Sequence, residues 1–413
     1  MTLLLGRRGL LRAGLATAAL PGLRGMAFAD PAAAAEVPLL IFIFLRGGMD
    51  GLHFLSPADD ADFVALRIPT LRNAAEGERA GQRLDASPAT DFRLHPEAAE
   101  LAEIWRQGRM AIWPAAGVPQ PTRSHFEAQA MMGLGQGHAG EASGRGGWLA
   151  AWAERVSGPA PVASLAGQER LTAELAGGHR GLALPSLARG LDLPGGAFGV
   201  AMLEALHARA AGPMGIAGRE ALLRLQSLDR ALPRGPGGQL LPYLPAHGAD
   251  YGPAAEFGRG LATIAQVARL QPGLAAAALD LGGWDTHDGQ AGRFEGRVRL
   301  LSRGLAALDA DLRDLPRRWT VLVTSEFGRR LRANRSGGTD HGRAGTVFAF
   351  GGGGGGGGRR SFGLGRHFGP WPGLAADALE DGVDLRVATD YREAFRQVMA
   401  ELAPTAPAPF GRG

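Results

Sequence analysis

The chain of 413 residues contains neither cysteine nor lysine. Without cysteine it has no disulfide, no thiolate metal site, no iron–sulfur cluster and no cysteine nucleophile. All 44 basic residues are arginines, and because 40 acidic residues oppose them the net charge is only +4. The sequence has no concentrated basic run, which argues against a nucleic-acid-binding surface. Hydrophobic residues make up 45% of the chain and charged residues 20%, a composition that excludes a disordered protein.

The N-terminal segment 1–29 predicts a twin-arginine export signal. Arg7 and Arg8 precede a weakly apolar stretch, Ala13–Leu23, which is too short to span a bilayer because a span takes roughly 20 residues. Ala27–Ala29 then form a small-x-small cleavage site before Asp30. The alternatives are a frayed basic helix or a membrane anchor. We expect the twin-arginine export machinery as a partner, a periplasmic or secreted location, and a mature chain without a transmembrane anchor.

Beyond the signal, short apolar runs alternate with helical patterns. Leu39–Leu45 is an unbroken apolar run, which is typical of a strand covered on both faces. Similar runs recur at 110–113, 275–281, 320–324 and 346–350. Helical patterns occur at 95–107, 124–132, 148–156, 219–232, 254–270, 293–312 and 391–402. This alternation predicts one α/β domain over residues 30–413, with a mostly parallel central sheet and helices on both faces. A Gly/Pro-rich, partly helical insertion is expected around 158–253.

Three Gly-Gly-x-Asp motifs place Asp50, Asp285 and Asp340 near predicted strand ends. The composition alone would give about half an occurrence of such a motif over the chain. In a parallel sheet, binding sites form beyond the carboxyl ends of the strands. Glycine pairs let the backbone pass close to an ion or an oxyanion. Gly-Asp pairs are also ordinary turn chemistry in a glycine-rich chain, and that alternative stays open.

Asp285 and His287 are two residues apart, so in extended backbone both side chains point the same way and form half of a metal site. A structural hydrogen-bonded pair is the alternative. Asp340 and His341 are adjacent and point apart. We therefore favour His341 as the ligand, with Asp340 orienting it or a neighbouring group. Glu326 directly follows an apolar strand, where it is either a ligand or an ion-pair partner of a nearby arginine.

With Asp50 added, these candidate ligands are all oxygen and nitrogen donors. Such a set suits a divalent metal ion, with zinc as the first choice and calcium, magnesium or manganese as alternatives. It also suits a hard phosphate- or sulfate-like substrate. His53, three residues after Asp50, is the one further histidine that is expected to reach the site.

The segment Thr122–Glu127 opens a predicted helix. Ser124 with Glu127 three residues later forms a capping box, which is the structural interpretation. In the functional interpretation, the hydroxyl of Ser124 attacks an ester bound at the helix N-terminus, because free N–H groups and the helix dipole favour an anion there. Arg123 and His125 would then help to hold the anion or the metal. Thr122 is the competing hydroxyl.

Five motifs together resemble a family of exported bacterial proteins of unknown function. They lie at 45–51 (Leu-Arg-Gly-Gly-Met-Asp-Gly), 123–126 (Arg-Ser-His-Phe), 282–287 (Gly-Gly-Trp-Asp-Thr-His), 325–329 (Ser-Glu-Phe-Gly-Arg) and 338–342 (Gly-Thr-Asp-His-Gly). That family is itself similar to the alkaline phosphatase and sulfatase superfamily. The resemblance implies an alkaline phosphatase-like α/β fold and a metal-dependent hydrolytic site. By position the residues that match its nucleophile and metal ligands are Ser124, Asp50, Asp285, His287, Glu326 and His341.

The chain also departs from the superfamily pattern. Phe327 occupies the place where a metal-binding histidine follows the acid, and the Asp-x-His spacing of Asp285 and His287 is shorter than in phosphatases. The sequence therefore leads to two expectations. The first is an exported metal-dependent hydrolase that acts on a small phosphate or sulfate ester. The second is an envelope protein that binds a metal or an anion without turnover.

Overall fold

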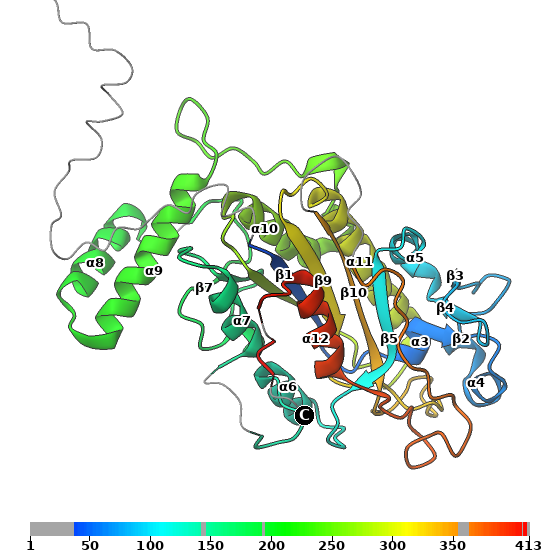
Figure 1. Ribbon diagram of the computed structural model, residues 1–413. Coiled ribbons are helices and arrows are strands. Elements are labelled where there is room, and N and C mark those ends of the chain that lie inside the picture. Colours follow the sequence, from blue (N-terminus) through cyan, green and yellow to red (C-terminus); the bar gives the residue numbers. More distant parts are fainter. Residues whose placement is uncertain (1–36, 142–145, 192–194, 354–362, 407, 411–413) are drawn as a thin grey trace, which may run out of the picture.

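The computed structural model describes residues 37–141, 146–191, 195–353, 363–406 and 408–410 (Figure 1). The predicted export signal at 1–29 lies outside the described residues. Within the described part of the chain, no helix is long and apolar enough to cross a membrane.

An eight-stranded sheet forms the centre of the molecule, with the strand order β11-β5-β10-β9-β1-β8-β6-β7 (Figure 1). The strands are β1 (Leu39–Leu45), β5 (Met110–Gly117), β6 (Ser164–Ala166), β7 (Gly181–Ala183), β8 (Ala276–Leu281), β9 (Arg318–Thr324), β10 (Gly345–Gly353) and β11 (Thr389–Asp390). Only β10 runs antiparallel to its neighbours in this sheet; the other pairs are parallel. The predicted mostly parallel α/β sheet is confirmed.

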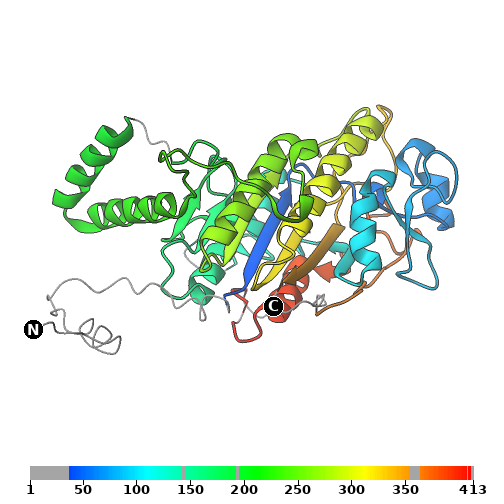
Figure 2. The ribbon, with the colours of Figure 1, turned by 90° about the horizontal axis from the view of Figure 1, so that it is seen from above.

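Helices cover both faces of this sheet, as predicted. Side chains of β1 alternate between two cores, with Leu39, Ile41, Ile43 and Leu45 in one and Leu40, Phe42 and Phe44 in the other. The first core is closed by α5 (Ala99–Arg106), α10 (Ala255–Leu270) and α11 (Gln290–Asp311). The second is closed by α6 (His125–Leu134), α7 (Trp148–Val156) and α12 (Tyr391–Leu402). Figure 2 shows α10 and α11 lying along one face of the sheet. Burial on both faces explains why β1 is an unbroken apolar run.

A small antiparallel sheet lies beside the main one in the order β2-β4-β3, formed by β2 (Leu55–Pro57), β3 (Gln82–Leu84) and β4 (Phe92–Leu94). The short helix α3 (Gly51–Phe54) connects β1 to β2 of this sheet, and α4 (Ala61–Leu66) lies between β2 and β3. The Gly/Pro-rich segment 158–253 supplies β6 and β7 and two longer helices, α8 (Gly196–Arg209) and α9 (Gly212–Ala231). These two helices form a hairpin that projects from the side of the molecule (Figures 1 and 2).

The sequence did not predict β6, β7, β11, α8 or the small sheet. These strands are two or three residues long, and periodicity cannot identify so short an element. The antiparallel direction of β10 was also not predicted, because a strand's direction depends on its neighbours and not on its own residues.

Candidate metal centre

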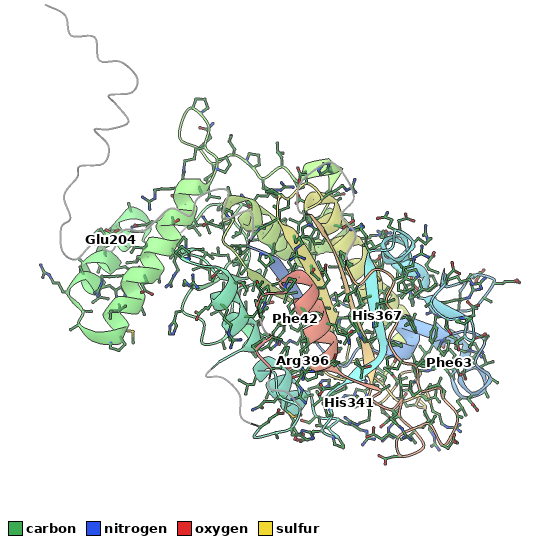
Figure 3. The ribbon with its side chains drawn as sticks, viewed as in Figure 1. Phe42, Phe63, Glu204, His341, His367 and Arg396 are labelled. Carbon is green, nitrogen blue, oxygen red and sulfur yellow. The ribbon has the colours of Figure 1, made fainter. Side chains whose placement is uncertain are left out.

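The predicted site residues come together at one edge of the main sheet. Asp285 follows β8 and Glu326 follows β9, and both strands are parallel neighbours of β1, with Leu45 opposite Leu281 and Phe44 opposite Thr324. The segment that carries His341 precedes β10, and because β10 is antiparallel its N-terminal end lies at this same edge. The chain after β5 leads to α6, whose first residue is His125. Figure 3 labels His341 at this end of the sheet.

Three imidazoles and one carboxylate converge on a common point. His341 Nε2 lies 3.1 Å from His125 Nε2 and 3.0 Å from His287 Nε2. Asp285 Oδ1 lies 3.3 Å from His341 Nε2 and 3.1 Å from His287 Nε2, and Asp285 Oδ2 lies 3.6 Å from His125 Nε2. His125, Asp285 and His341 each offer one ligand atom within 4.8 Å of the others. We call these four residues the His/Asp cluster.

The opposite nitrogen of each imidazole fixes the tautomer. In all three rings Nδ1 faces an oxygen that can only accept a hydrogen bond, so Nδ1 carries the hydrogen. The acceptors are Glu326 Oε1 for His125 at 2.7 Å, Asp340 Oδ1 for His287 at 3.2 Å and the Arg123 carbonyl for His341 at 2.9 Å. In the neutral rings the Nε2 lone pair of His341 then faces those of His125 and His287, an arrangement that a cation or an extra proton would stabilise.

The separations fit one small metal ion. A tetrahedral zinc ion with bonds of roughly 2.0–2.1 Å holds its ligands about 3.3 Å apart. The distances of 3.0–3.6 Å within the His/Asp cluster bracket this value. Imidazoles that donate their second N–H to a carboxylate or a carbonyl are also the usual environment of histidine ligands. His125, Asp285 and His341 therefore fit a zinc ion as three candidate ligands, whereas His287 contacts His341 and Asp285 but is not part of the group whose ligand atoms all lie within 4.8 Å.

Glu326 orients His125 and lies behind the cluster. Its Oε1 also accepts from the Gly47 amide at 2.9 Å and from Gln129 Nε2 at 2.8 Å. Burial by itself raises the pKa of Glu326, but the hydrogen bonds, with that of His125 foremost, outweigh it and lower the pKa to about 2. The hydrogen bond to ionised Glu326 in turn raises the pKa of His125. Arg329 and Arg330, the two nearby arginines expected as ion-pair partners, lie by Asp285 and Asp384 instead, and neither forms an ion pair with Glu326 among the described residues.

Asp340 has the corresponding position behind His287. Its Oδ1 accepts from Asn334 Nδ2 at 3.1 Å as well as from His287, and these hydrogen bonds, that of Asn334 first, lower the pKa of Asp340. The sequence left open whether Asp340 orients His341 or a neighbouring group. The structure shows the neighbouring group, His287.

Asp50 lies outside the cluster, which corrects its prediction as a ligand. Its carboxylate is fully buried, and Arg67 binds both oxygens, at 2.6 and 3.2 Å. Burial raises the pKa of Asp50, but the charge of Arg67 and further donors outweigh burial and lower the pKa. Gln290 Nε2 also donates to Asp50, at 2.7 Å, and Gln290 Oε1 accepts from Thr339 beside Asp340. Asp50 thus anchors the loop that carries the cluster residues.

His53 belongs to this buried network and not to the cluster. The His53 ring is fully buried and stacks on Phe294, with the ring centroids 4.4 Å apart. Burial lowers the pKa of His53 well below its ordinary value, so this histidine is neutral. The His53 ring lies beside the Asp50 carboxylate, and the amide nitrogen of Gln290 lies 3.2 Å from His53 Nδ1.

The segment before α6 confirms the capping role of Ser124, whose Oγ accepts from the Glu127 amide at 3.5 Å. Ser124 is exposed and directly precedes His125. Thr122, the competing hydroxyl, is buried and donates to Glu127 Oε2 at 2.6 Å. The Arg123 guanidinium, expected to hold an anion, pairs instead with Asp384. Of the three hydroxyl and guanidinium candidates, only Ser124 is exposed and has no ion-pair or side-chain partner among the described residues.

Two glycines and an aromatic ring shape the floor of the centre. Gly47 has φ +122°, and a Cβ there would come within 2.5 Å of the Asp285 amide. Gly48 has φ +63°, and a Cβ there would come within 2.5 Å of the Phe327 ring. That ring packs on His125 and on His341, with centroid separations of 4.8 and 4.9 Å. Phe327 thus supports the imidazoles of His125 and His341 and supplies no ligand of its own.

The sequence assigned His125 to substrate or metal and did not rank it among the ligands. It also missed Arg67, Gln290, Asn334 and Gln129, which hold the site from outside. A histidine at the first position of a helix behind a strand end was the one available signal for His125. The other four carry no pattern, because their partners lie far away in the sequence.

The fold and the cluster define an α/β protein with a candidate metal centre at the edge of its sheet. A protein family described as "Protein of unknown function (DUF1501)" matches residues 243–386. This segment contains Asp285, His287, Glu326, Asp340 and His341, so the part of the chain that supplies most of the site is similar to a family of unknown function. No curated protein and no solved structure matches the chain.

Replacing Asp340 by alanine is expected to weaken metal binding by about 10- to 100-fold without abolishing it, because His287 loses the acceptor that orients its ring. Competition titration of zinc against a chromophoric chelator measures this change. Asp288→Ala is the matched control, since Asp288 is a nearby acid that pairs with Arg293 and does not contact the histidines of the cluster. Equal zinc affinity in Asp340→Ala and in the unmodified protein would contradict the orienting role.

Proposed function

We propose that the protein is an exported, metal-dependent hydrolase of a small phosphate or sulfate ester. The observation that carries the proposal is the His/Asp cluster, with its Nε2 atoms directed at one point and its Nδ1 atoms held by Glu326, Asp340 and a backbone carbonyl. A divalent ion held there, zinc by preference, would neutralise charge on the ester oxygens and polarise the bond to the leaving group.

Ser124 is the proposed nucleophile. Its hydroxyl is exposed at the N-terminus of α6 and is bound only by a long hydrogen bond from the Glu127 amide, so it is available to a substrate that lies over His125. A bond forms between Ser124 Oγ and the phosphorus or sulfur atom while the bond to the alcohol oxygen breaks. The hydroxyl proton ends on the departing alcohol, and water then releases the serine.

Arg297 of α11 is proposed to bind the negative charge of the substrate. Its side chain lies across Gly283, where a Cβ would come within 2.9 Å of Arg297 Nε and where φ is +90°. Gly283 is exposed and lies two residues before Asp285. Among the residues that the structure describes, the guanidinium of Arg297 makes no hydrogen bond or ion pair. An unpaired guanidinium beside the centre suits a doubly charged ester.

The alkaline phosphatase-like fold and the export pathway are proposed mainly from the sequence. The five motifs and the site at the carboxyl edge of a mostly parallel sheet support an alkaline phosphatase-like fold. The paired arginines at 7 and 8 and the cleavage pattern before Asp30 support export through the twin-arginine pathway into the periplasm or beyond.

Substitution of Ser124 tests the mechanism. The purified protein is first screened with phosphomonoesters, phosphodiesters and sulfate esters. With a substrate in hand, Ser124→Ala is expected to lower kcat on the order of 10³-fold or more. Ser124→Asn retains a helix-capping oxygen but no hydroxyl and should be equally inactive, whereas Ser124→Thr retains both and should keep measurable turnover. An active Ser124→Asn protein would remove Ser124 from the mechanism.

A non-catalytic metal- or anion-binding protein of the envelope is the second candidate. It is favoured by Phe327, which fills the place of a further metal ligand and packs on His125 and His341. Turnover of an ester distinguishes the hydrolase from the non-catalytic binding protein. A zinc-loaded protein that turns over none of the three ester classes, yet binds inorganic phosphate or sulfate in a calorimetric titration, supports the second.

A further inference from the structure

The hairpin of α8 and α9, residues 196–231, presents an apolar helix face that nothing in the described structure covers. We call this hairpin the arm. No residue of α8 is buried. Phe198, Met202 and Leu206 are 74%, 58% and 63% exposed. With Ala201 and Ala205 they follow the spacing i, i+3, i+4, i+7, i+8, which places all five on one side of the helix, and we call them the stripe.

The other side of α8 is already used. Glu204 of α8 accepts a hydrogen bond from Gln226 of α9. Gly218 brings the helices close together, since a Cβ there would collide with the His207 ring. Arg219 donates to the carbonyl of Ala210 at 3.2 Å and to that of His207, and so closes the end of α8. The hairpin is therefore a defined unit, and the stripe is its free face.

We propose that the stripe is the contact surface of a homodimer, in which the arms of two copies pack side by side as four helices. The arm carries the stripe away from the main sheet (Figures 1 and 2), so two arms can meet without a clash of the sheets. An uncharged helix stripe is complementary to an identical one across a twofold axis. The wide spacing of its apolar residues suits ridges-into-grooves packing between helices.

The exposed apolar surface of the arm is large enough for a small dimer interface. Met214 and Ile216, at the start of α9, are also 76% and 52% exposed. Met214 and Ile216 are two residues apart and point to different sides of α9, so at most one of them extends the stripe. Four large side chains of this kind offer roughly 500 Å² per copy, so a pair of arms buries about 1,000 Å², the smallest area expected of a specific interface.

The charge of the arm favours a second copy over a lipid surface. Residues 196–231 contain four arginines and three acidic residues, so the arm is nearly neutral. A helix that lies in an anionic membrane has instead a strongly basic polar face beside its apolar one. A monomeric protein that exposed this stripe to water would carry an uncompensated apolar patch.

Sedimentation equilibrium of the full chain tests the proposal. The unmodified protein is expected to sediment at twice the chain mass at micromolar concentration, and the double variant Met202→Glu/Leu206→Glu at the chain mass, because four carboxylates would have to be desolvated at the interface. The matched control is Leu244→Glu, which places a charge on a leucine that is 81% exposed but lies outside the arm and should leave the dimer intact. Circular dichroism confirms the fold of each variant.

A second measurement does not depend on the charged variants. Because the chain has no cysteine, Leu206→Cys introduces a unique thiol, which should form an intermolecular disulfide on mild oxidation, whereas Leu244→Cys should not. A monomeric unmodified protein, or a dimer that survives Met202→Glu/Leu206→Glu, overturns the proposal. So does binding of the unmodified protein, but not of the double variant, to phosphatidylglycerol vesicles without dimerisation. Zinc content is measured in parallel and should be the same in all variants, so this test is independent of the proposed hydrolase.

Discussion

The variant His341→Ala is expected to lose its metal, whereas the unmodified protein should bind close to one equivalent of zinc per chain. His341 is the central member of the His/Asp cluster, because its Nε2 atom lies within 3.3 Å of ligand atoms on His125, His287 and Asp285. Loss of an orienting partner weakens a metal site about 10- to 100-fold, and loss of a ligand should exceed that range. Elemental analysis after dialysis against zinc measures the bound metal.

The control for this variant is His179→Ala, which removes an exposed histidine far from the cluster in the sequence and should leave the zinc content unchanged. The circular dichroism spectrum of His341→Ala should also be unchanged, because the cluster lies at the edge of the sheet and not in either core. Equal zinc content in His341→Ala and in the unmodified protein would show that the three imidazoles are a hydrogen-bonded structural group. An unmodified protein that binds no zinc would end the hydrolase proposal as well.

Replacing Asp50 by alanine is expected to destabilise the fold by about 3–5 kcal/mol, because the variant leaves Arg67 buried without its partner. Both side chains are completely buried, and they form two hydrogen bonds. Gln290 would lose an acceptor at the same time, and with it part of the support for Thr339. Urea unfolding followed by circular dichroism gives the free energy of unfolding.

The double variant Asp50→Leu/Arg67→Met is the control, since removal of both charges should recover much of the loss. The zinc content of the two folded variants decides whether Asp50 is a metal ligand. Both variants should bind zinc when folded, because Asp50 lies outside the cluster. A stable Asp50→Ala protein that has lost its zinc would return Asp50 to the set of ligands.

The sequence was informative wherever local pattern and chemistry coincide. The run Leu39–Leu45 predicted β1 residue for residue, because a strand buried on both faces has no polar position to interrupt it. The patterns at 148–156 and 391–402 likewise match α7 and α12. The rule that sites form at the carboxyl ends of parallel strands predicted the edge at which Asp285 and His287 lie. It does not account for His341, which precedes β10 and reaches this edge because β10 is antiparallel.

The rest depended on which distant residues become neighbours. Asp50 has the same Gly-Gly-x-Asp pattern as Asp285, and no local feature separates them. They differ because Asp50 is fully buried and bound by Arg67, which follows α4, whereas Asp285 is half-exposed and lies beside the imidazoles of the cluster as well as the Arg329 guanidinium, 2.6 Å from its Oδ1. In the same way, the sequence offered Glu326 as a ligand or as an ion-pair partner of an arginine, and its actual partner, His125, follows only from the distance between the two side chains.

By itself, then, the sequence determined the class of fold, the edge at which the site forms and the donor atoms available there. These follow from hydrophobic periodicity, from glycine positions and from the absence of cysteine, all of which are local properties. The tertiary structure alone decided which donors share one point, which carboxylates are neutralised by arginine and which helix face stays uncovered. Those outcomes depend on contacts between segments more than 200 residues apart, such as those of Glu326 with His125 and with Gly47. The physical reason is that only packing of the whole chain sets such distances.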